Sequence, residues 1–317
     1  MTQPGATPSW QVAAIITMAA AVVLTALPLV ANDYALHVLT ISLYYTILAA
    51  SWNLLAGFTG QFSLAHQAFA AIGAYTTGLL IHYWHIPIWL SIPAGVLVAA
   101  LLGFALGRIV LGMRAIYLAI ATWAFAETIH ILLAAAYQIT RGELGLSVPP
   151  LYSTLAPRAY YFTFEALTIA SVLAMYLIVR SPLGYFMRAV RDDELRAASL
   201  GVNTTLVKVS VFTIASAFAG LAGAFFAHYT VVLSPQMADF SEMAKLIIMV
   251  VVGGLGSFAG PLIGAAPVQA LTTYLAKYGE WDMVIYGLVV IALMRSHTGG
   301  LVAIARQIMA QVRGRSR

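Results

Sequence analysis

Two groups of polar residues in this sequence have types and spacings that could do chemistry inside an apolar chain. The first is Glu127 with His130, three residues apart and therefore on one face of a helix. Glu127 is the only acid that we place well inside an apolar run. A charge there costs about 2.5–3.5 kcal/mol on insertion scales, so we expect it to face a bundle interior or a polar cavity. The pair could belong to a pathway or proton relay, or could be a structural hydrogen bond between helices.

The second group surrounds Gly57 and Gly60. Its members are Asn53, Gln61, Ser63, His66 and Gln67. A lone histidine in such a place is more often a hydrogen-bonded structural residue than a ligand, and no second His, Cys or carboxylate lies near it at metal spacing. We therefore predict no metal site. The candidates to line a substrate pathway are Asn53, Gln61, Ser63, His66, Glu127 and His130.

The sequence lacks the short signatures of several enzyme classes. It has no G-x-x-x-x-G-K-S/T phosphate loop, no H-E-x-x-H pair and no G-x-S-x-G turn. The glycines of residues 254–260 loosely resemble a dinucleotide-binding loop, but their spacing differs and no βαβ unit surrounds them. We expect no catalytic residue, no cofactor and no ATP hydrolysis by this chain.

The elements that must position these residues are strongly apolar. Of the 317 residues, 62% are apolar and 9% are charged, and the mean hydropathy is +0.90. A soluble domain is about 45–50% apolar and about 25% charged, so a water-soluble globule and a disordered chain are both excluded. The apolar runs are continuous rather than alternating, which argues against a transmembrane β-barrel. The sequence predicts an all-α polytopic membrane protein with a single transmembrane domain over residues 1–317.

Ten apolar runs are candidate spans, because about 20 apolar residues cross a bilayer. They cover residues 11–31, 35–57, 62–83, 87–107, 114–137, 160–180, 205–232, 243–259, 262–276 and 283–297. The last two runs are short, so a re-entrant hairpin is an alternative there. Residues 1–10 contain no Lys or Arg, so we interpret the first run as a retained helix rather than a signal peptide.

The basic residues predict the orientation, because Lys and Arg concentrate on the cytoplasmic side of membrane proteins. With a cytoplasmic N-terminus and ten spans, twelve basic residues lie inside and four lie outside. The four are Arg141, Arg158, Lys245 and Lys277. We therefore predict that both termini are cytoplasmic. The net charge of +5 is explained by this topology, so we expect no nucleic-acid partner.

The predicted cytoplasmic stretch 181–204 carries a helix of its own. Ser181 and Pro182 suit its first positions, and Gly201 suits its end. Arg188, Asp192 and Arg196 are spaced for ion pairs along one helix over 182–200. Elsewhere, small residues recur every four positions, which is typical of close helix packing in lipid. They are Ala99, Gly103 and Gly107; Ala215, Ala219, Gly223 and Ala227; and Gly256, Gly260 and Gly264.

Four stretches, in order, resemble one transport family. They are residues 57–75, 191–208, 216–223 and 253–261. The first reads GFTGQFSLAHQAF followed by GAY, and is similar to the signature G-x-x-G-Q-x-S-x-G-H-A-A-F…G-A-Y. That signature is typical of branched-chain amino acid ABC transporter permeases of the LivM type. The resemblance runs from about residue 40 to residue 295. The chain departs from the pattern at Ala65, Gln67 and Arg141, where the family has Gly, Ala and Gly.

The resemblance implies a permease subunit in a bacterial cytoplasmic (inner) membrane. Its partners would be a second homologous permease, two cytoplasmic ATP-binding subunits, a periplasmic substrate-binding protein and the lipid bilayer. Helix 182–200 would couple the ATPases to the membrane domain. The residues expected at that interface are Arg188, Arg191, Glu194, Ala197, Ala198 and Gly201.

The substrate and the energy source have alternatives at this point. Because the chain departs from the family pattern, related permeases for urea, amides or aromatic acids are alternatives to a branched-chain amino acid importer. A proton-coupled transporter that uses Glu127 and His130 is another. An intramembrane enzyme would need a paired acid, a Ser–His pair or a metal set, and the sequence shows none at suitable spacing.

Overall fold

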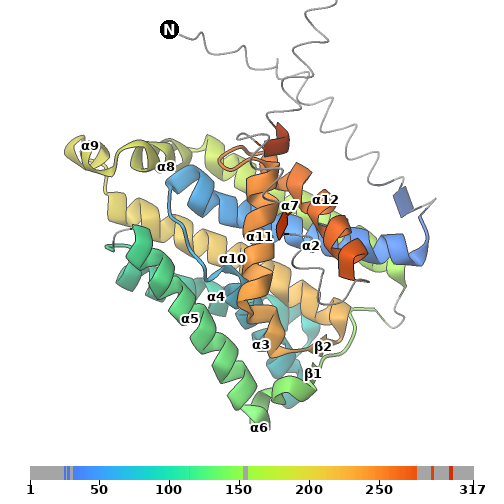
Figure 1. Cartoon of the computed structure of the whole chain (residues 1–317). Helices are drawn as coiled ribbons and strands as arrows, with labels where there is room; N and C mark the ends of the chain where they lie inside the picture. Colours follow the sequence, from blue (N-terminus) through green and yellow to red (C-terminus); the bar gives the residue numbers. More distant parts are fainter. Residues whose placement is uncertain are drawn as a thin grey trace, which may run out of the picture.

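The structure, a computed structural model, describes residues 31–113, 115–152 and 156–276, with residues 25, 27, 28, 287, 288 and 300–302. Within these ranges the chain is a bundle of helices with one two-residue strand pair (Figure 1), so the predicted all-α class is confirmed. The predicted runs 11–31 and 283–297 lie outside the described residues, apart from isolated positions.

Six long helices form the body of the bundle. They are α2 (Asp33–Asn53), α3 (His66–Trp84), α4 (Ile88–Val110), α5 (Ala115–Ala135), α7 (Pro157–Arg180) and α10 (Thr204–Thr230). A π-helical turn, η1 (Leu54–Thr59), continues α2. In the described part of the chain, five helices are long and apolar enough to cross a membrane: α2 with η1, α4, α5, α7 and α10. The prediction of ten spans is therefore not confirmed.

Shorter elements complete the fold. They are α6 (Tyr137–Thr140), η2 (Gly142–Leu144), β1 (Leu146–Ser147), α8 (Pro182–Asp192), α9 (Glu194–Ser199), β2 (Val232–Leu233), η3 (Pro235–Ala238), α11 (Phe240–Gly253) and α12 (Gly260–Leu275). Helices α11 and α12 occupy the predicted runs 243–259 and 262–276, but have only 14 and 16 residues. Each is shorter than the roughly 20 residues of a full span.

The two ends of the bundle differ in chemistry. At the arginine-rich end, α4 and α7 finish near Arg108 and Arg180, and α8 and α9 follow. At the opposite end, β1 pairs antiparallel with β2, Leu146 with Leu233 (Figure 1). Exposed Trp84 and Trp89 lie where α3 ends and α4 begins. Tryptophan is enriched at membrane interfaces, so this arrangement agrees with spans that run between two polar boundaries.

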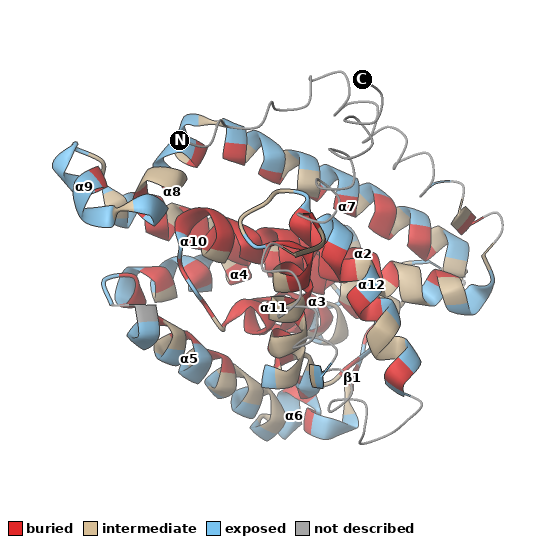
Figure 2. Cartoon of the chain, turned by 45° about the horizontal axis from the view of Figure 1, so that its top comes forward, coloured by how far each residue is buried: buried red, intermediate tan, exposed pale blue. Residues whose placement is uncertain are grey.

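Small residues let the central helix α10 approach its neighbours closely. Ala215, Ala219 and Ala227 of α10 are fully buried. The centre of the bundle, where α10 passes, is coloured largely as buried (Figure 2). A side chain added at Gly223 would overlap the backbone of Ala70 in α3, and one at Gly103 would overlap Ser216. The packing interpretation of the small-residue repeats is confirmed for this part of the bundle.

The single helix predicted for 182–200 is two helices. Asp193 has extended backbone angles (φ −161°, ψ 103°), and its side chain accepts a hydrogen bond from Arg196 N, so it caps α9. An aspartate at the N-cap accepts a hydrogen bond from a backbone N–H group that has no partner at the start of a helix. Asp193 therefore stabilises the start of a new helix, α9, and with it the break after α8. The predicted pairs of Asp192 do not form in this stretch. Arg196 instead pairs with Asp193 at 3.5 Å, and Glu194 with Lys208 at 2.6 Å.

Candidate functional site

Asn53 joins the end of α2 to the loop between α11 and α12. Its Nδ2 donates to Ser257 O at 2.9 Å, and its Oδ1 accepts from Gly256 N at 2.9 Å. The side chain is buried. Gly57, one turn later, has no room for a side chain, because a Cβ there would lie 2.7 Å from Gly256 N. The loop therefore packs directly on the backbone of η1.

Arg191 reaches the same place from α8. Its Nη1 donates to Gly57 O at 2.6 Å. It also borders two glycines in the left-handed region, Gly60 (φ +75°) and Gly256 (φ +76°). A Cβ on Gly256 would lie 2.9 Å from Arg191 Nη1. We define this meeting of Asn53, Gly57, Gly60, Arg191 and Gly256 as the α8 junction. Arg191, which the sequence placed among the ATPase contacts, directs its guanidinium group toward the bundle.

Ser63 and His66 are held by structural hydrogen bonds. Trp52 Nε1 donates to Ser63 O at 2.8 Å, and His66 Nε2 lies 2.8 Å from Ser51 Oγ. All of these side chains are buried. Gln61 differs, because it is 4% exposed and neither polar atom of its side chain has a hydrogen-bond partner in the described part of the protein. The predicted polar group thus gathers around the end of α2, with Gln61 alone retaining unused hydrogen-bonding capacity.

Glu127 and His130 lie on α5, apart from the α8 junction along the sequence and the fold. His130 Nδ1 lies 3.1 Å from Pro235 O in η3, and the ring of Trp123 packs against Phe240 at 6.4 Å. Since residues 123, 127 and 130 share a helical face, Glu127 is directed to the segment that joins η3 and α11. Glu127 is half-buried, and among the described residues it has no hydrogen bond or ion pair, either with His130 or with another helix.

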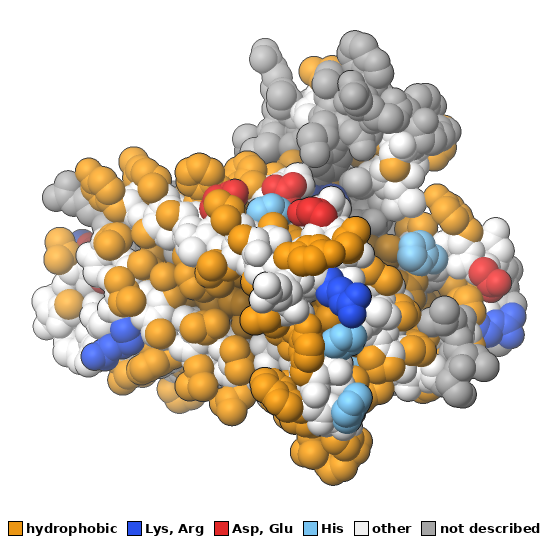
Figure 3. Space-filling model, turned by 90° about the horizontal axis from the view of Figure 1, so that it is seen from below, with side chains coloured by type: hydrophobic (Ala, Val, Ile, Leu, Met, Phe, Trp, Pro, Cys, Tyr) orange, Lys and Arg blue, Asp and Glu red, His pale blue; other side chains and the backbone are white. Residues whose placement is uncertain are grey.

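Lys245, which the sequence analysis assigned to the outside, forms a half-buried ion pair with Glu242 on α11. Lys245 Nζ donates to both carboxylate oxygens of Glu242, at 2.8 and 3.0 Å. Tyr45, in the middle of α2, donates to the same carboxylate, and Gln67 Nε2 donates to Glu242 O at 3.3 Å. Their spacing of three residues on a helix was the signal for this pair. Seen from below, acidic side chains lie beside a histidine near the centre of a mostly hydrophobic face, and other histidines and basic side chains lie further out (Figure 3).

Glu165 is a second acid inside an apolar run, so the interpretation of Glu127 as the only such acid is wrong. It lies on α7, is 3% exposed, and its Oε1 has no hydrogen-bond partner among the described residues. One turn later, Thr168 Oγ1 donates to Leu43 O of α2 at 3.3 Å, so Glu165 lies on the face of α7 that meets α2. Its position five residues inside the run 160–180 was the signal for burial.

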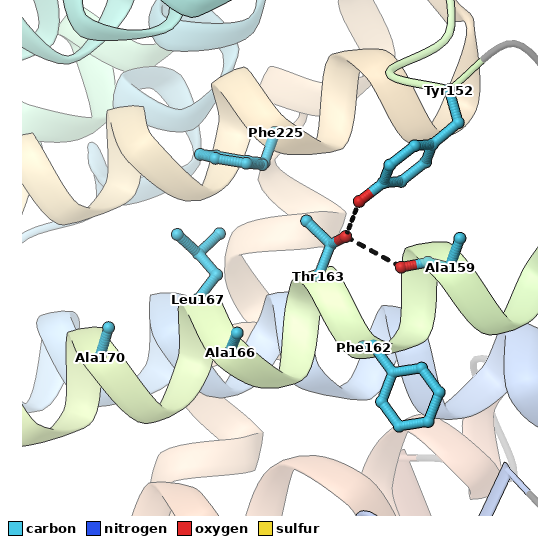
Figure 4. A pocket seen from close by; sticks show the side chains of 8 residues that line it. All are labelled: Tyr152, Ala159, Phe162, Thr163, Ala166, Leu167, Ala170 and Phe225. Carbon is cyan, nitrogen blue, oxygen red and sulfur yellow. Dashed lines mark hydrogen bonds between the residues drawn. The ribbon is translucent and has the colours of Figure 1, made fainter.

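An open groove of about 670 Å³ runs between α7 and α10 (Figure 4). It is lined by Tyr152, Ala159, Phe162, Thr163, Ala166, Leu167, Ala170 and Phe225. Tyr152 and Thr163 hydrogen-bond to each other, and Thr163 also donates to Ala159 O at 2.8 Å. The hydroxyl groups of Tyr152 and Thr163 are therefore already hydrogen-bonded. The rest of the lining is apolar, and it contains no charged group that could recognise a small polar solute.

The fold and its long apolar helices define a polytopic α-helical membrane protein. The chain belongs to the family of branched-chain amino acid transport system permease components, whose model matches residues 34–294. It is 31% identical to the high-affinity branched-chain amino acid transport system permease protein LivM of Salmonella typhimurium and to that of Escherichia coli. Each match covers 92% of this chain and 75% of the relative. It is 25% identical to LivH of Salmonella typhimurium, over 82% of this chain and 92% of that protein. No solved structure matches.

Proposed function

We propose that this chain is the membrane-spanning permease subunit of an ATP-driven (ABC) importer for branched-chain or related small amino acids. The family match over residues 34–294 carries the proposal. The absence of a phosphate loop from the sequence agrees with ATP hydrolysis in separate subunits. We place the protein in a bacterial inner membrane with both termini cytoplasmic, because the basic residues gather at one end of the bundle.

The assembly we propose has several subunits. Relatives named LivM and LivH both match this chain, which supports pairing with a second homologous permease. Two ATP-binding subunits would dock at the arginine-rich end, and a periplasmic binding protein would deliver substrate at the end that carries β1 and β2. Residues 1–317 would form one permease domain.

Exposed leucines on α9 support docking of the ATPases at the arginine-rich end. Leu195 is 85% exposed and Leu200 is 81% exposed, although both lie outside the candidate spans. Large apolar side chains left in water mark a surface that a protein partner covers. Ala198 and Gly201 lie beside them and are exposed as well.

Burial and side-chain contacts support a smaller set of docking residues than the set predicted from the sequence. Ala197 is 4% exposed and faces the bundle, and the carboxylate of Glu194 is held by Lys208 of α10. Arg188 lies over the ring of Tyr185 at 5.0 Å and is half-buried. We therefore propose that Leu195, Ala198, Leu200 and Gly201 contact the ATPase, with Arg188 at the edge.

Co-purification tests this docking surface. The variant with Leu195→Ser and Leu200→Ser should insert normally but lose the ATP-binding subunits. Leu144→Ser is a matched control, because Leu144 is 72% exposed at the opposite end of the bundle. Unchanged recovery of the ATPases with the double variant would contradict docking on α9.

Uptake into vesicles tests the energy source and the substrate. With the complete assembly reconstituted, labelled leucine should accumulate only when ATP and the binding protein are supplied. Accumulation driven by a pH gradient with this chain alone would instead favour the proton-coupled transporter. Uptake of urea, an amide or an aromatic acid with no uptake of leucine would assign the chain to a related permease.

A further inference from the structure

The α8 junction links the proposed docking helices to the interior of the bundle through one side chain. Arg191 is the tenth of the eleven residues of α8, and its guanidinium group donates to Gly57 O in η1 at 2.6 Å. The last carbonyls of a helix lack partners within that helix, and a cation near them interacts favourably with the helix dipole. Because the guanidinium group is charged, its bond to Gly57 O is charge-assisted and stronger than a bond between neutral groups.

Three glycines allow this approach. Gly60 and Gly256 adopt left-handed angles that other residues reach only with strain. The Cγ of Arg191 lies 3.4 Å from the position of a Cβ on Gly60. A Cβ on Gly57 would lie 2.7 Å from Gly256 N. The backbone around Arg191 is thus shaped to bring α8, η1 and the α11–α12 loop to one point.

Asn53 extends the link from η1 to the α11–α12 loop. It holds Gly256 N and Ser257 O with two bonds of 2.9 Å. A displacement of Arg191 would therefore act on the end of α2 and on the α11–α12 loop together. The element that receives it is a π-helical turn, a type of distortion that is frequent at functional sites.

The neighbouring helix α9 is anchored elsewhere. Glu194 pairs with Lys208 of α10 at 2.6 Å, and the extended residue Asp193 separates this anchor from that of Arg191. The two docking helices are thus attached to different helices of the bundle. A motion imposed on α8 and α9 has two routes inward, and the route through Arg191 bonds directly to η1, which Asn53 ties to the α11–α12 loop.

We propose that Arg191 is a positioning residue that transmits movement of the docked ATPases to η1 and the α11–α12 loop, and so couples ATP hydrolysis to opening of the pathway. The proposal rests on the proposed function. It assigns Arg191 an inward role rather than a direct contact with the ATPase.

The test measures assembly, ATP hydrolysis and transport separately, in the complete complex reconstituted in vesicles. Arg191→Met keeps the apolar stem but removes the donor. It should retain the ATPases and basal ATP hydrolysis, while leucine transported per ATP falls by about tenfold, the factor expected for loss of a charge-assisted bond. Arg191→Lys keeps a cation that can reach Gly57 O, and should stay within about threefold of wild type. Asp192→Asn, at the exposed neighbouring position, is the matched control and should behave as wild type.

A cysteine pair gives a second readout in the same complex. The chain has no cysteine, and the Cβ of Arg191 lies 3.7 Å from the position of a Cβ on Gly60, within the usual range for a disulfide. The variant with Gly60→Cys and Arg191→Cys should be uncoupled when reduced. It should regain transport per ATP when oxidised, because the disulfide restores a link between α8 and η1. The two single variants should not respond to oxidation.

Several results would overturn the proposal. Wild-type transport per ATP in Arg191→Met would show that the link is not needed. Loss of the ATPases from Arg191→Met would make Arg191 a docking residue, and a Lys variant no better than the Met variant would remove the role of the cation. A disulfide that forms without restoring coupling would also count against it. Failure of the proposed function is distinguishable, because the wild-type complex would then show no ATP-dependent uptake.

Discussion

Replacing Gly95 by alanine tests whether close backbone contact between α3 and α4 stabilises the bundle. A Cβ at this position would lie 2.6 Å from Gly73 O and 2.6 Å from Thr77 Oγ1. Ordinary contact begins at 3.4 Å, so the two helices would have to separate by about 0.8 Å. The hydroxyl of Thr77 donates to Ser91 O at 3.1 Å and is buried, so it has little room to move.

Two opposing effects decide the outcome. Alanine is more favourable than glycine inside a helix by about 1 kcal/mol. Adding volume to a packed interior costs about 1–3 kcal/mol, and disturbing the Thr77 bond adds about 1 kcal/mol. Gly95→Ala should therefore reduce the free energy of unfolding by about 1–3 kcal/mol, which corresponds to a fall in Tm of several degrees, about 2–4 °C per kcal/mol.

Gly107→Ala is the matched control on the same helix. Its Cβ would lie 3.2 Å from Leu111 Cδ1, the end of a flexible side chain, and 3.6 Å from Phe212. The helix propensity gain is the same, so this variant should be neutral or slightly stabilised. Thermal unfolding of purified protein in detergent measures both. A Tm for Gly95→Ala equal to or above that of Gly107→Ala would refute the close-packing argument.

Four further predictions concern other parts of the molecule. Asn53→Ala leaves Gly256 N and Ser257 O unpaired and should cost about 1–3 kcal/mol for each group, measured as a lower Tm, whereas no change would mean that the loop is held by other contacts. Glu127→Gln should leave assembly intact and reduce leucine uptake, and unchanged uptake would demote Glu127 to a dispensable residue. A reporter active only in the periplasm, fused after Arg317, should stay silent, and activity there would contradict an even number of spans. Arg141→Gly should raise the free energy of unfolding by about 1 kcal/mol, because Arg141 has a left-handed backbone (φ +62°), and a lower stability would contradict strain there.

The sequence predicts the class and the packing well because both depend on composition and local spacing. Continuous apolar runs predicted most helix positions, and small residues every four positions predicted the contacts of α10. Gly201 adopts the expected left-handed angle (φ +87°), and Asn203 next to it caps α10 by accepting a hydrogen bond from Leu206 N at 2.9 Å. Caps and glycine stops are properties of a few neighbouring residues, so a sequence reveals them directly.

The sequence could not predict contacts between distant segments. The bond from Arg191 to Gly57 joins residues 134 positions apart, and Asn53 meets Ser257 across 204 positions. The position of Glu242 and Lys245 also depends on how η3 and α11 fold back against α2. From the sequence alone, a charged residue near the end of an apolar run is assigned to a loop. A hydrogen-bonding partner such as Tyr45 allows that residue to lie between the helices instead.

The three departures from the family pattern, at Ala65, Arg141 and Gln67, differ in their structural effects. Ala65 has a negative φ (−94°), so its backbone does not require a glycine at this position. Arg141 keeps the left-handed angle that a glycine would adopt more easily, so this departure adds a cation to the loop and leaves its path unchanged. Gln67 adds a donor that bonds to Glu242 O at 3.3 Å, next to the ion pair with Lys245. Of the three, only Gln67 contacts a residue of the ion pair, through the main-chain carbonyl of Glu242, so this departure adds a bond between α3 and α11.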